Sequence, residues 1–293
     1  MNQKSYYCLY DKKYHFKSAF DMISGAYVRT GILDENGKDT GKDPFMASYP
    51  HLIDVGIMGH CIHGKSGLCA KAGIGCYQSG MLVEQPNMTL ENFRHIAEQS
   101  KGRCNQFALG GRGDPDQHEH FEEILRICWE NRIVPNFTTS GYGMTTEVAA
   151  LCKKYCGAVA VSWYRSEYTL QAIQMLLDAG VKTNIHYVLG KNSIDEAIDR
   201  LKNDDFPKGV NAVIFLLHKP AGQGTKNNML SVDDPRVKAF FNQVDKHHSF
   251  KVGLDSCNVP GAIQFCHSVL PESLDTCEGR RFSCYISADM IMV

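Results

Sequence analysis

From Leu52 onward, short apolar runs alternate with amphipathic segments along the chain. This alternation predicts repeated strand–helix units around a parallel sheet. The apolar runs are rich in β-branched residues and almost continuous, which is typical of strands covered on both faces. They predict six strands, at Leu52–Met58, Asn105–Leu109, Ile133–Thr138, Ala158–Trp163, Lys182–Leu189 and Ala212–His218.

Five amphipathic segments between these runs predict helices, at Leu90–Gln99, Gln117–Glu130, Thr146–Tyr155, Tyr168–Asp178 and Ile194–Leu201. Thr89, Asp116 and Thr145 stand at expected helix starts. Ser193 starts another helix, with Glu196 three positions on as its capping-box partner. Six strand–helix units in about 190 residues are too few for a closed eight-unit barrel and predict an α/β fold with an open, partial (β/α)6 barrel.

The chain divides into three parts. Residues 1–50 are turn-rich, and we expect them to wrap the barrel mouth or to form a small hairpin layer. Residues 51–249 hold the barrel units. Residues 250–293 form a C-terminal extension that carries Cys257, Cys266, Cys277 and Cys284 and stops within an apolar run. Because a domain rarely ends on such a run, we expect this extension to be incomplete.

Composition indicates an ordinary soluble protein of 293 residues, with 43% hydrophobic and 22% charged residues. A net charge of -1 gives no sign of a nucleic-acid or membrane-surface partner. The sequence has no apolar stretch of signal-peptide length at its start and no later run near the roughly 20 residues that span a bilayer. We therefore expect a cytoplasmic protein, in which most of the 12 cysteines are thiols that ligate metal or fill the core.

The segment from Met58 to Gly80, MGHCIHGKSGLCAKAGIGCYQSG, has several interpretations. Gly59-x4-Gly64-Lys65-Ser66 matches the phosphate-binding loop of nucleotide hydrolases. That mechanism needs a helix beginning at the Lys–Ser pair. The glycines that follow disfavour a helix, since each costs about 1 kcal/mol in a helix interior.

The cysteines of this segment allow three further interpretations. His60 or His63 could complete a zinc site, but the spacing C-x7-C-x6-C lacks the closely spaced pair typical of zinc. The three cysteines could also be unliganded core residues. Alternatively they could hold an iron–sulfur cluster, because three thiolates on a four-iron cluster leave one iron open to a small molecule. No acidic residue lies between Asp54 and Glu84, and such surroundings suit an anionic cluster.

The three-cysteine loop after the first strand resembles that of the radical S-adenosylmethionine (radical SAM) superfamily. The motif FALGGRGDP, Phe107–Pro115, extends the likeness, which runs from Leu52 to about Pro220. The resemblance implies a partial barrel, a four-iron four-sulfur (4Fe-4S) cluster on Cys61, Cys69 and Cys76, and S-adenosylmethionine as cosubstrate. The superfamily spacing is usually C-x3-C-x2-C with an aromatic residue before the last cysteine. Here Gly75 holds that place, and we expect Tyr77 to supply the aromatic wall.

The resemblance also implies the residues that contact the cosubstrate. The backbone at Gly110 and Gly111 would meet its amino group, with Asp114 in the same motif. Thr138–Gly141 resembles the superfamily's Thr-Asn-Gly turn and would bring Ser140 to the site. Ser162, His186 and the segment Leu216–Pro220 would contact or shape the pocket for the ribose, carboxylate and adenosine.

The C-terminal extension resembles the start of a SPASM or twitch auxiliary-cluster extension, which occurs in peptide- and protein-modifying members. The resemblance implies reductive cleavage of S-adenosylmethionine to a 5′-deoxyadenosyl radical that takes a hydrogen atom from a substrate. The tail alone leads to the hypothesis that this substrate is a peptide or protein side chain. A reductant such as flavodoxin or ferredoxin is implied as partner. The alternatives are a phosphate-loop nucleotide hydrolase and a non-catalytic cluster-binding remnant.

Overall fold

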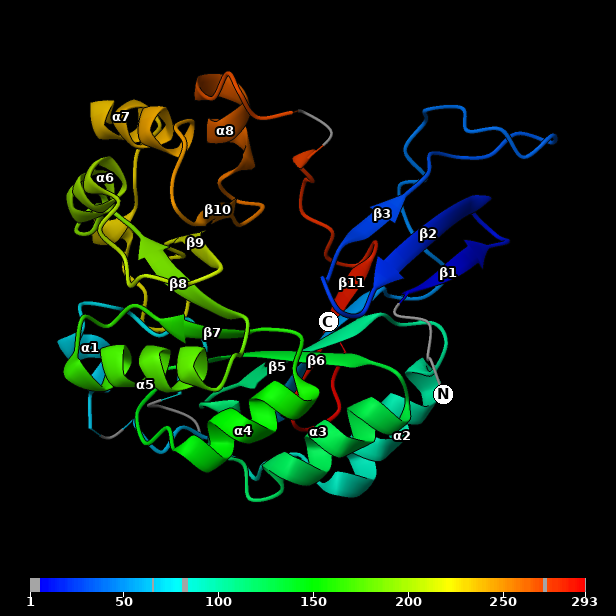
Figure 1. The fold of residues 1–293 in the computed structure, drawn as a ribbon, viewed down its shortest axis with the longest axis horizontal. Helices are drawn as coiled ribbons and strands as arrows, with labels where there is room; N and C mark the ends of the chain where they lie inside the picture. The colour runs from blue at the N-terminus through cyan, green and yellow to red at the C-terminus, as the bar shows by residue number, and fades with distance from the viewer. Residues whose placement is uncertain (1–5, 65, 81–83, 271–272, 293) are drawn as a thin grey trace.

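An eight-stranded sheet forms the centre of the protein in the computed structural model, which describes residues 6–64, 66–80, 84–270 and 273–292. The strand order is β10-β9-β8-β7-β6-β5-β4-β11, and all neighbouring strands are parallel. The strands are β4 (Leu52–Met58), β5 (Gln106–Gly111), β6 (Val134–Thr139), β7 (Val159–Ser162), β8 (Thr183–Leu189), β9 (Ala212–Leu217), β10 (Lys251–Leu254) and β11 (Ser283–Ile286). Figure 1 shows the sheet curving around the middle of the molecule.

The six strands β4 to β9 confirm the predicted partial barrel. β4 matches its predicted range at both ends. The sheet is wider than predicted, because β10 pairs with β9 and β11 pairs with β4 at the two edges. Within the described residues these two edge strands do not pair with each other, so the barrel is open between them.

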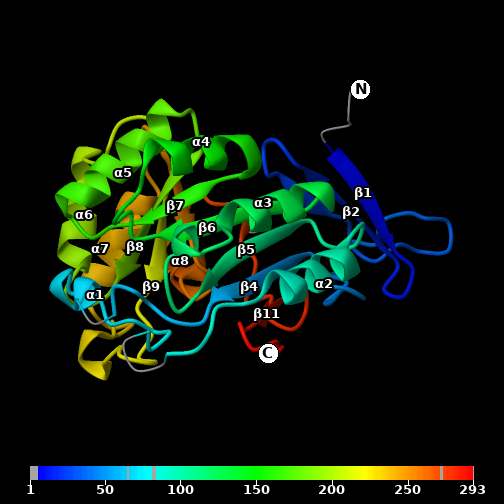
Figure 2. The ribbon, with the colours of Figure 1, turned by 90° about the horizontal axis from the view of Figure 1, so that it is seen from below.

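Helices cover the outer face of the sheet. They are α2 (Leu90–Ser100), α3 (Phe121–Glu130), α4 (Thr146–Tyr155), α5 (Glu167–Asp178), α6 (Ile194–Asn203), α7 (Pro235–Val244) and α8 (Val259–Phe265), with a four-residue helix α1 (Leu68–Lys71). Figure 2 shows α2 to α5 side by side on this face. Ile53, Val55 and Ile57 of β4 face the helices and are at most 2% exposed. No described helix is long and apolar enough to cross a membrane.

The predicted helix starts were partly right. The side chains of Thr89 and Thr145 accept hydrogen bonds from the third residue after them, as expected of N-caps. Asp116 does not start α3, because Pro115–Gln117 forms a separate 3-10 turn, η1, and buries this carboxyl. The capping box at Ser193 is also wrong, since the Ser193 hydroxyl instead donates to the Val188 carbonyl and accepts from Gly190 N–H.

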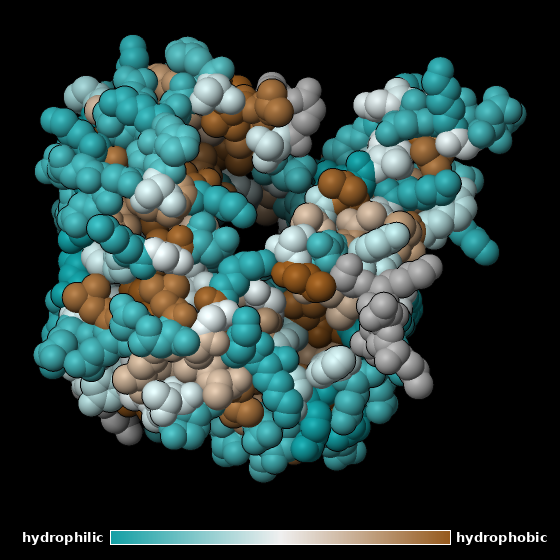
Figure 3. All heavy atoms as spheres, viewed as in Figure 1, coloured by the Kyte–Doolittle hydropathy of each residue, from teal (hydrophilic) through white to brown (hydrophobic). Residues whose placement is uncertain are grey.

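The inner face of the sheet is not covered, contrary to the prediction. Closed barrels fill their interior with layers of bulky branched side chains. Here β8 and β9 add Val188, Ile214 and Leu216 to the inner face, but most inner positions from β4 to β8 are small or polar: Asp54, Gly56, Ala108, Gly110, Asn136, Thr138, Ala160, Asn184 and His186. The barrel therefore encloses a lumen, whose lower part is a cavity of about 350 Å³. Figure 3 shows the hollow in the middle of the molecule.

A three-stranded antiparallel sheet lies at the amino ends of the barrel strands. It consists of β1 (Tyr6–Asp11), β2 (Phe16–Asp21) and β3 (Tyr27–Arg29). Phe20, Ser24 and Gly25 line the cavity from this side. Lys182 Nζ donates to the Ile23 and Ser24 carbonyls at 3.1 and 2.8 Å. The N-terminal segment thus lies at the base of the lumen, opposite the ends that carry the three-cysteine loop.

Ion pairs join the C-terminal segment to the N-terminal one. Arg29 contacts Glu278 at 2.7 Å and Asp275 at 3.1 Å, and Arg281 contacts Asp43 at 3.2 Å. These contacts lie beside β11, the strand that the tail adds to the sheet. The apolar run at the end of the chain therefore belongs to the barrel sheet.

Candidate functional site

The cysteine loop crosses the carboxyl edge of the barrel sheet. Cys61 lies three residues beyond β4, Cys69 lies in α1, and Cys76 lies farther along. Gln223 N–H, in the segment after β9, donates to the Cys76 carbonyl at 2.9 Å. The loop therefore spans from the first of the six predicted strands to the sixth.

The close approach between the Cys76–Tyr77 end of the loop and the segment after β9 depends on Gly222. This residue has φ +57, and a Cβ on it would lie 2.5 Å from the Tyr77 carbonyl oxygen. A side chain there would push the two segments apart. The docking of Cys76 against the segment after β9 thus requires glycine at this position.

The three predicted ligand thiols lie within electrostatic reach of one another. Burial raises the pKa of Cys61 and of Cys69, and the nearby Cys76 thiol raises both further. The Cys61 thiol also raises the pKa of Cys69. The loop thus holds Cys61, Cys69 and Cys76 near enough for their thiols to affect one another's pKa.

Buried donors without partners flank this region. Among the described residues, His63 Nε2 and Arg112 Nε are buried and have no hydrogen-bond partner. The backbone next to Arg112 packs on the loop, because a Cβ on Gly113 would lie 3.3 Å from Cys61 Cα. Buried donors are normally satisfied. A buried Arg112 Nε without a partner, in a segment packed on the cysteine loop, fits an anionic cluster, whose sulfurs accept hydrogen bonds.

A single-ion site is not supported. The described residues contain no group of three or more His, Cys, Asp or Glu side chains that could hold one metal ion. Ligands of one zinc ion converge on a single point about 2.3 Å from each sulfur. In a cluster each thiolate binds a different iron, so the three sulfurs lie farther apart. The donor set therefore fits a cluster better than zinc.

The phosphate-loop interpretation finds little support either. α1 begins at Leu68, after Gly67 with φ +67, and lasts four residues. The Ser66 hydroxyl donates to the His63 carbonyl at 2.8 Å, and Lys65 lies outside the described residues. A phosphate loop needs a helix that starts at the Lys–Ser pair and directs its N–H groups at phosphate. This geometry is not present around Ser66.

Gly110 and Gly111 end β5 beside the end of β4. Their register partners are Gly56 and Met58. Gly111 has φ +115, and a Cβ on it would lie 2.3 Å from the Met58 carbonyl oxygen, so the strand ends can meet only with glycine there. A Cβ on Gly110 would meet no atom within 4 Å. Gly110 therefore leaves open space on the lumen side.

Asp114 links the ends of β5 and β6. It accepts hydrogen bonds from the Ser140 backbone N–H at 2.9 Å and from the Ser140 hydroxyl. Its Oδ2 lies 3.4 Å from His63 Nε2. The His63 ring meets the Tyr142 ring edge-on at 4.9 Å between centroids. Two predicted site residues, Asp114 and Ser140, thus form one polar cluster with the cysteine loop.

Asp116 belongs to the same region and was missed as a site residue. Burial, together with the neighbouring Asp114 carboxylate, raises the pKa of Asp116 to about 6. Its Oδ1 is buried and has no hydrogen-bond partner among the described residues. The sequence signal was present but ambiguous, because an aspartate before an amphipathic segment also predicts a helix cap.

Ser162 and His186 are register partners at the ends of β7 and β8. His186 Nδ1 lies 3.1 Å from Thr138 Oγ1, and burial lowers the pKa of His186 to about 4. The imidazole is therefore neutral at pH 7 and can both donate and accept one hydrogen bond. Thr138 and His186 line the cavity within the lumen.

The aromatic contact to the loop differs from the expected one. Tyr77 is 63% exposed, whereas the Tyr164 hydroxyl lies 3.2 Å from Cys69 Sγ. Tyr164 lies two residues beyond β7, and its N–H donates to the Ser162 carbonyl. Sequence reasoning missed Tyr164, because nothing local to it indicates a contact with a cysteine 95 residues away.

The tail cysteines lie on separate elements. Cys257 and Cys277 are exposed. Cys266 ends α8, with its Sγ 3.7 Å from the Phe241 carbonyl, and Cys284 lies in β11. The structure therefore does not assemble them into one site.

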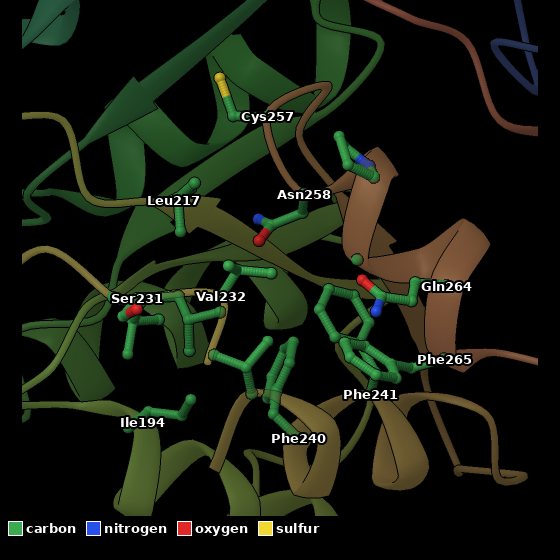
Figure 4. Close-up of a pocket in the computed structure, with 15 residues that line it drawn as sticks. Ile194, Leu217, Ser231, Val232, Phe240, Phe241, Cys257, Asn258, Gln264 and Phe265 are labelled. Atoms are coloured by element: carbon green, nitrogen blue, oxygen red, sulfur yellow. The ribbon is translucent and has the colours of Figure 1, made fainter. Parts of the chain in front are cut away.

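A second cavity of about 190 Å³ lies between α7 and α8. Figure 4 shows Phe240, Phe241 and Phe265 turned into it. Of the residues predicted to contact or shape the cosubstrate site, Leu217 alone lines this pocket. It is apolar and belongs to the outer layer, separate from the cysteine loop.

Solved structures share this fold. SuiB from Streptococcus suis, bound to its precursor peptide SuiA, superposes with a TM-score of 0.66 over 99% of this chain and 82% of that chain, at 11% identity. SuiB bound to S-adenosylmethionine gives 0.61 over 85% of this chain and 60% of that chain, at 13% identity. anSMEcpe with bound AdoMet gives 0.55 over 82% and 73%, at 14% identity.

No protein-family model matches the sequence, and no curated protein matches it. At such low identities the structural likeness concerns the fold. The described strands and helices follow the partial-barrel architecture that the sequence predicts. The chain thus has the α/β partial-barrel fold of SuiB and anSMEcpe, proteins whose structures contain bound S-adenosylmethionine.

Proposed function

We propose that the protein is a radical SAM enzyme that modifies a peptide or protein side chain. Cys61, Cys69 and Cys76 would hold a four-iron four-sulfur cluster at the carboxyl edge of the barrel. S-adenosylmethionine would bind beside it, and a protein reductant such as flavodoxin or ferredoxin would supply electrons. When bound and reduced, the cluster would supply the electron that cleaves the cosubstrate to methionine and a 5′-deoxyadenosyl radical able to take hydrogen from a substrate.

One observation carries the proposal: three thiols of one loop lie near enough to affect one another's pKa, and the loop packs on the backbone of Arg112, whose Nε is buried without a hydrogen-bond partner. His63 Nε2 has the Asp114 carboxylate at 3.4 Å, whereas Arg112 Nε has no hydrogen-bond partner among the described residues. A cluster with its thiolates is anionic and accepts hydrogen bonds through sulfur. The same loop lies above an open lumen, so a group bound there faces a space that can hold a substrate.

The residues of the lumen wall would bind and orient the cosubstrate. Gly110 leaves room for it to approach the β5 backbone, and Asp114 lies beside the loop. Neutral His186 and Ser162 offer hydrogen bonds on the opposite wall without adding charge. Enclosure by the cysteine loop and the barrel would exclude water from the reacting atoms.

The peptide class rests on the neighbours and on the shape of the lumen. SuiB has been solved with its precursor peptide, and anSMEcpe with a bound Cp18Cys peptide. The lumen of this chain holds a cavity of about 350 Å³, and Figure 3 shows a hollow in the middle of this face of the molecule, through which an extended chain could reach the interior. We propose the same class of substrate here.

Anaerobic reconstitution with iron and sulfide tests the proposal. We expect about four irons and four sulfides per chain, a broad absorbance shoulder near the visible range, and, after reduction with dithionite, equal amounts of methionine and 5′-deoxyadenosine from S-adenosylmethionine. Fully loaded protein that yields no 5′-deoxyadenosine would contradict the enzyme and favour a non-catalytic cluster-binding protein. Protein that binds nucleotide without iron would instead favour the phosphate loop.

A further inference from the structure

Asp54 faces the lumen from the middle of β4. Its neighbours Ile53 and Val55 point to the helices and are 2% and 0% exposed, so the alternation of the strand turns Asp54 to the inner face. Its register partners are Ala108 of β5 and Tyr285 of β11. Asp54 is accessible to water although protein surrounds it on most sides, as expected in a water-filled lumen.

The carboxylate of Asp54 has no direct partner. Of the described residues, none donates a hydrogen bond to it or lies within ion-pair distance. Burial raises its pKa to about 6, and the more distant Lys219 lowers it in part. Lys219 acts in the same way on Asp255, which follows β10. One lysine therefore faces two carboxyl groups, and a negative charge in the lumen is left without a partner.

Tyr285 lies beside this carboxylate. Because the two residues are register partners on neighbouring parallel strands, their side chains project from the same face. A Cβ on Gly56 would lie 2.5 Å from the Tyr285 hydroxyl, so the tyrosine extends along the inner face of β4. A carboxylate next to an aromatic ring is a favourable pair for an ammonium or guanidinium group.

The rest of the wall suits a peptide backbone. Asn136 Nδ2 donates to Gln106 Oε1 at 3.0 Å, and Asn211 Nδ2 donates to Asn184 Oδ1 at 2.8 Å. All four amides line the cavity at the lower end of the lumen. Each amide has more donors and acceptors than these contacts use. They can therefore bond to peptide groups without bringing charge.

We infer that Asp54 and Tyr285 form a subsite for a positively charged substrate group, a lysine ammonium or an arginine guanidinium, in a peptide held within the lumen. This inference rests on the proposed function for its peptide substrate. It goes beyond the proposed function because it specifies that the bound substrate group is positively charged, which the three cysteines do not determine. Tyr285 comes from the C-terminal strand, so the tail completes the subsite.

Binding of two labelled peptides to the full chain tests the inference without any cofactor chemistry. The probes are fluorescent alanine pentapeptides with a central lysine or a central norleucine, which has a similar aliphatic chain but no charge. Fluorescence anisotropy should show at least about tenfold tighter binding of the lysine peptide, since charge-assisted hydrogen bonds are the stronger kind. This preference should disappear in Asp54→Asn and weaken in Tyr285→Leu.

Asp199→Asn is the matched control, because Asp199 is exposed on the outer helix α6. It should keep the full preference for lysine. Asp54→Asn removes a charge without a partner, so it should unfold at the same temperature as the unmodified chain or higher. Equal affinity for the two peptides, no binding of either peptide, or an unchanged preference in Asp54→Asn would overturn the inference.

The outcome is separable from that of the proposed function. Formation of 5′-deoxyadenosine with no lysine preference would refute the subsite and leave the radical chemistry intact. A lysine preference that depends on Asp54, in protein that loads no cluster, would support the subsite and refute the proposed enzyme.

Discussion

The hydroxyl of Tyr164 lies 3.2 Å from the Sγ of Cys69. This contact joins the turn after β7 to the short helix α1 of the cysteine loop. Burial and the nearby Cys69 thiol raise the pKa of Tyr164 well above its ordinary value, so the phenol keeps its proton at any working pH. Tyr164 can therefore donate a hydrogen bond to a thiolate at Cys69.

Tyr164→Phe should lower the reduction potential of the reconstituted cluster. A hydrogen bond to a cluster sulfur favours the reduced, more negative state, and its loss should shift the midpoint by about a few tens of millivolts to lower values. Potentiometric titration followed by electron paramagnetic resonance measures the shift. An unchanged or higher midpoint in protein with full iron content would contradict the role given to Tyr164.

Alanine at Cys61, Cys69 or Cys76 should each reduce the iron and sulfide content after reconstitution to background. Three ligands are the minimum for a site-differentiated four-iron cluster, so each is needed. Cys257→Ala, at an exposed cysteine outside the loop, should retain full iron content. Full loading of any of the three loop variants would show that its cysteine is not a ligand.

Gly222→Ala should disrupt the docking of the cysteine loop. The added Cβ would come within 2.5 Å of the Tyr77 carbonyl oxygen. Gly37→Ala is the matched control, since Gly37 has φ +76 but no atom within 4 Å of the added Cβ. We expect several-fold less iron in Gly222→Ala and normal iron in Gly37→Ala, with circular dichroism showing that both remain folded. Equal iron content in the two variants would contradict the role of the docking contact.

Asp114→Ala should lower the free energy of unfolding by about 1–3 kcal/mol, because the buried Ser140 loses the acceptor for its backbone N–H and its hydroxyl. Urea denaturation of the chain without cofactor measures this change. The double variant Asp114→Ala/Ser140→Ala should be less destabilised than the sum of the two single variants. Simple additivity would show that the two side chains do not act as a pair.

Glu196 makes stability depend on pH. Burial alone would raise its pKa, but hydrogen bonds from Arg165 and Arg200 lower it to about 2. A depressed folded pKa stabilises the protein above the unfolded value of about 4.3, and this contribution is lost as pH falls from there toward 2. Because the side chain is 29% exposed, solvent screening reduces the contribution to about 1–2 kcal/mol.

Glu196→Gln should therefore destabilise the protein by that amount at pH 7 and by much less near pH 2.5. Urea unfolding at the two pH values gives the comparison. Glu91→Gln, in the exposed first turn of α2, should show little change at either pH. A loss of stability in Glu196→Gln that grows as pH falls would contradict the sign of the shift.

Most of the barrel could be predicted from local patterns. β4 and α4 agree with their predicted ranges at both ends, because apolar runs and helix periodicity report local burial. α3 was predicted too early, since Pro115–Gln117 forms its own turn. β10 and β11 were not predicted as barrel strands, because four-residue strands carry little periodic signal and their pairing partners are distant in the chain.

The candidate site divides in the same way. The cysteine loop and the glycines of β5 were recognisable because their residues are close together in the chain. The roles of Tyr164, Asp54 and Tyr285 were not, since each depends on a neighbour from another strand. In the sequence, Asp54 is a single acidic residue within an apolar strand. The structure shows that Ile53 and Val55 pack on the helix side of β4, so Asp54 faces the lumen.

The sequence by itself determined the order of strands and helices and the residue types that can bind a cluster, because both follow from spacing along the chain. The tertiary structure alone decided that the loop docks on the segment after β9, that the barrel interior is hollow, and that the tail adds Tyr285 beside Asp54. The physical reason is that these contacts join residues far apart in the chain. They form only when the sheet has curved and β10 and β11 have paired at its two edges.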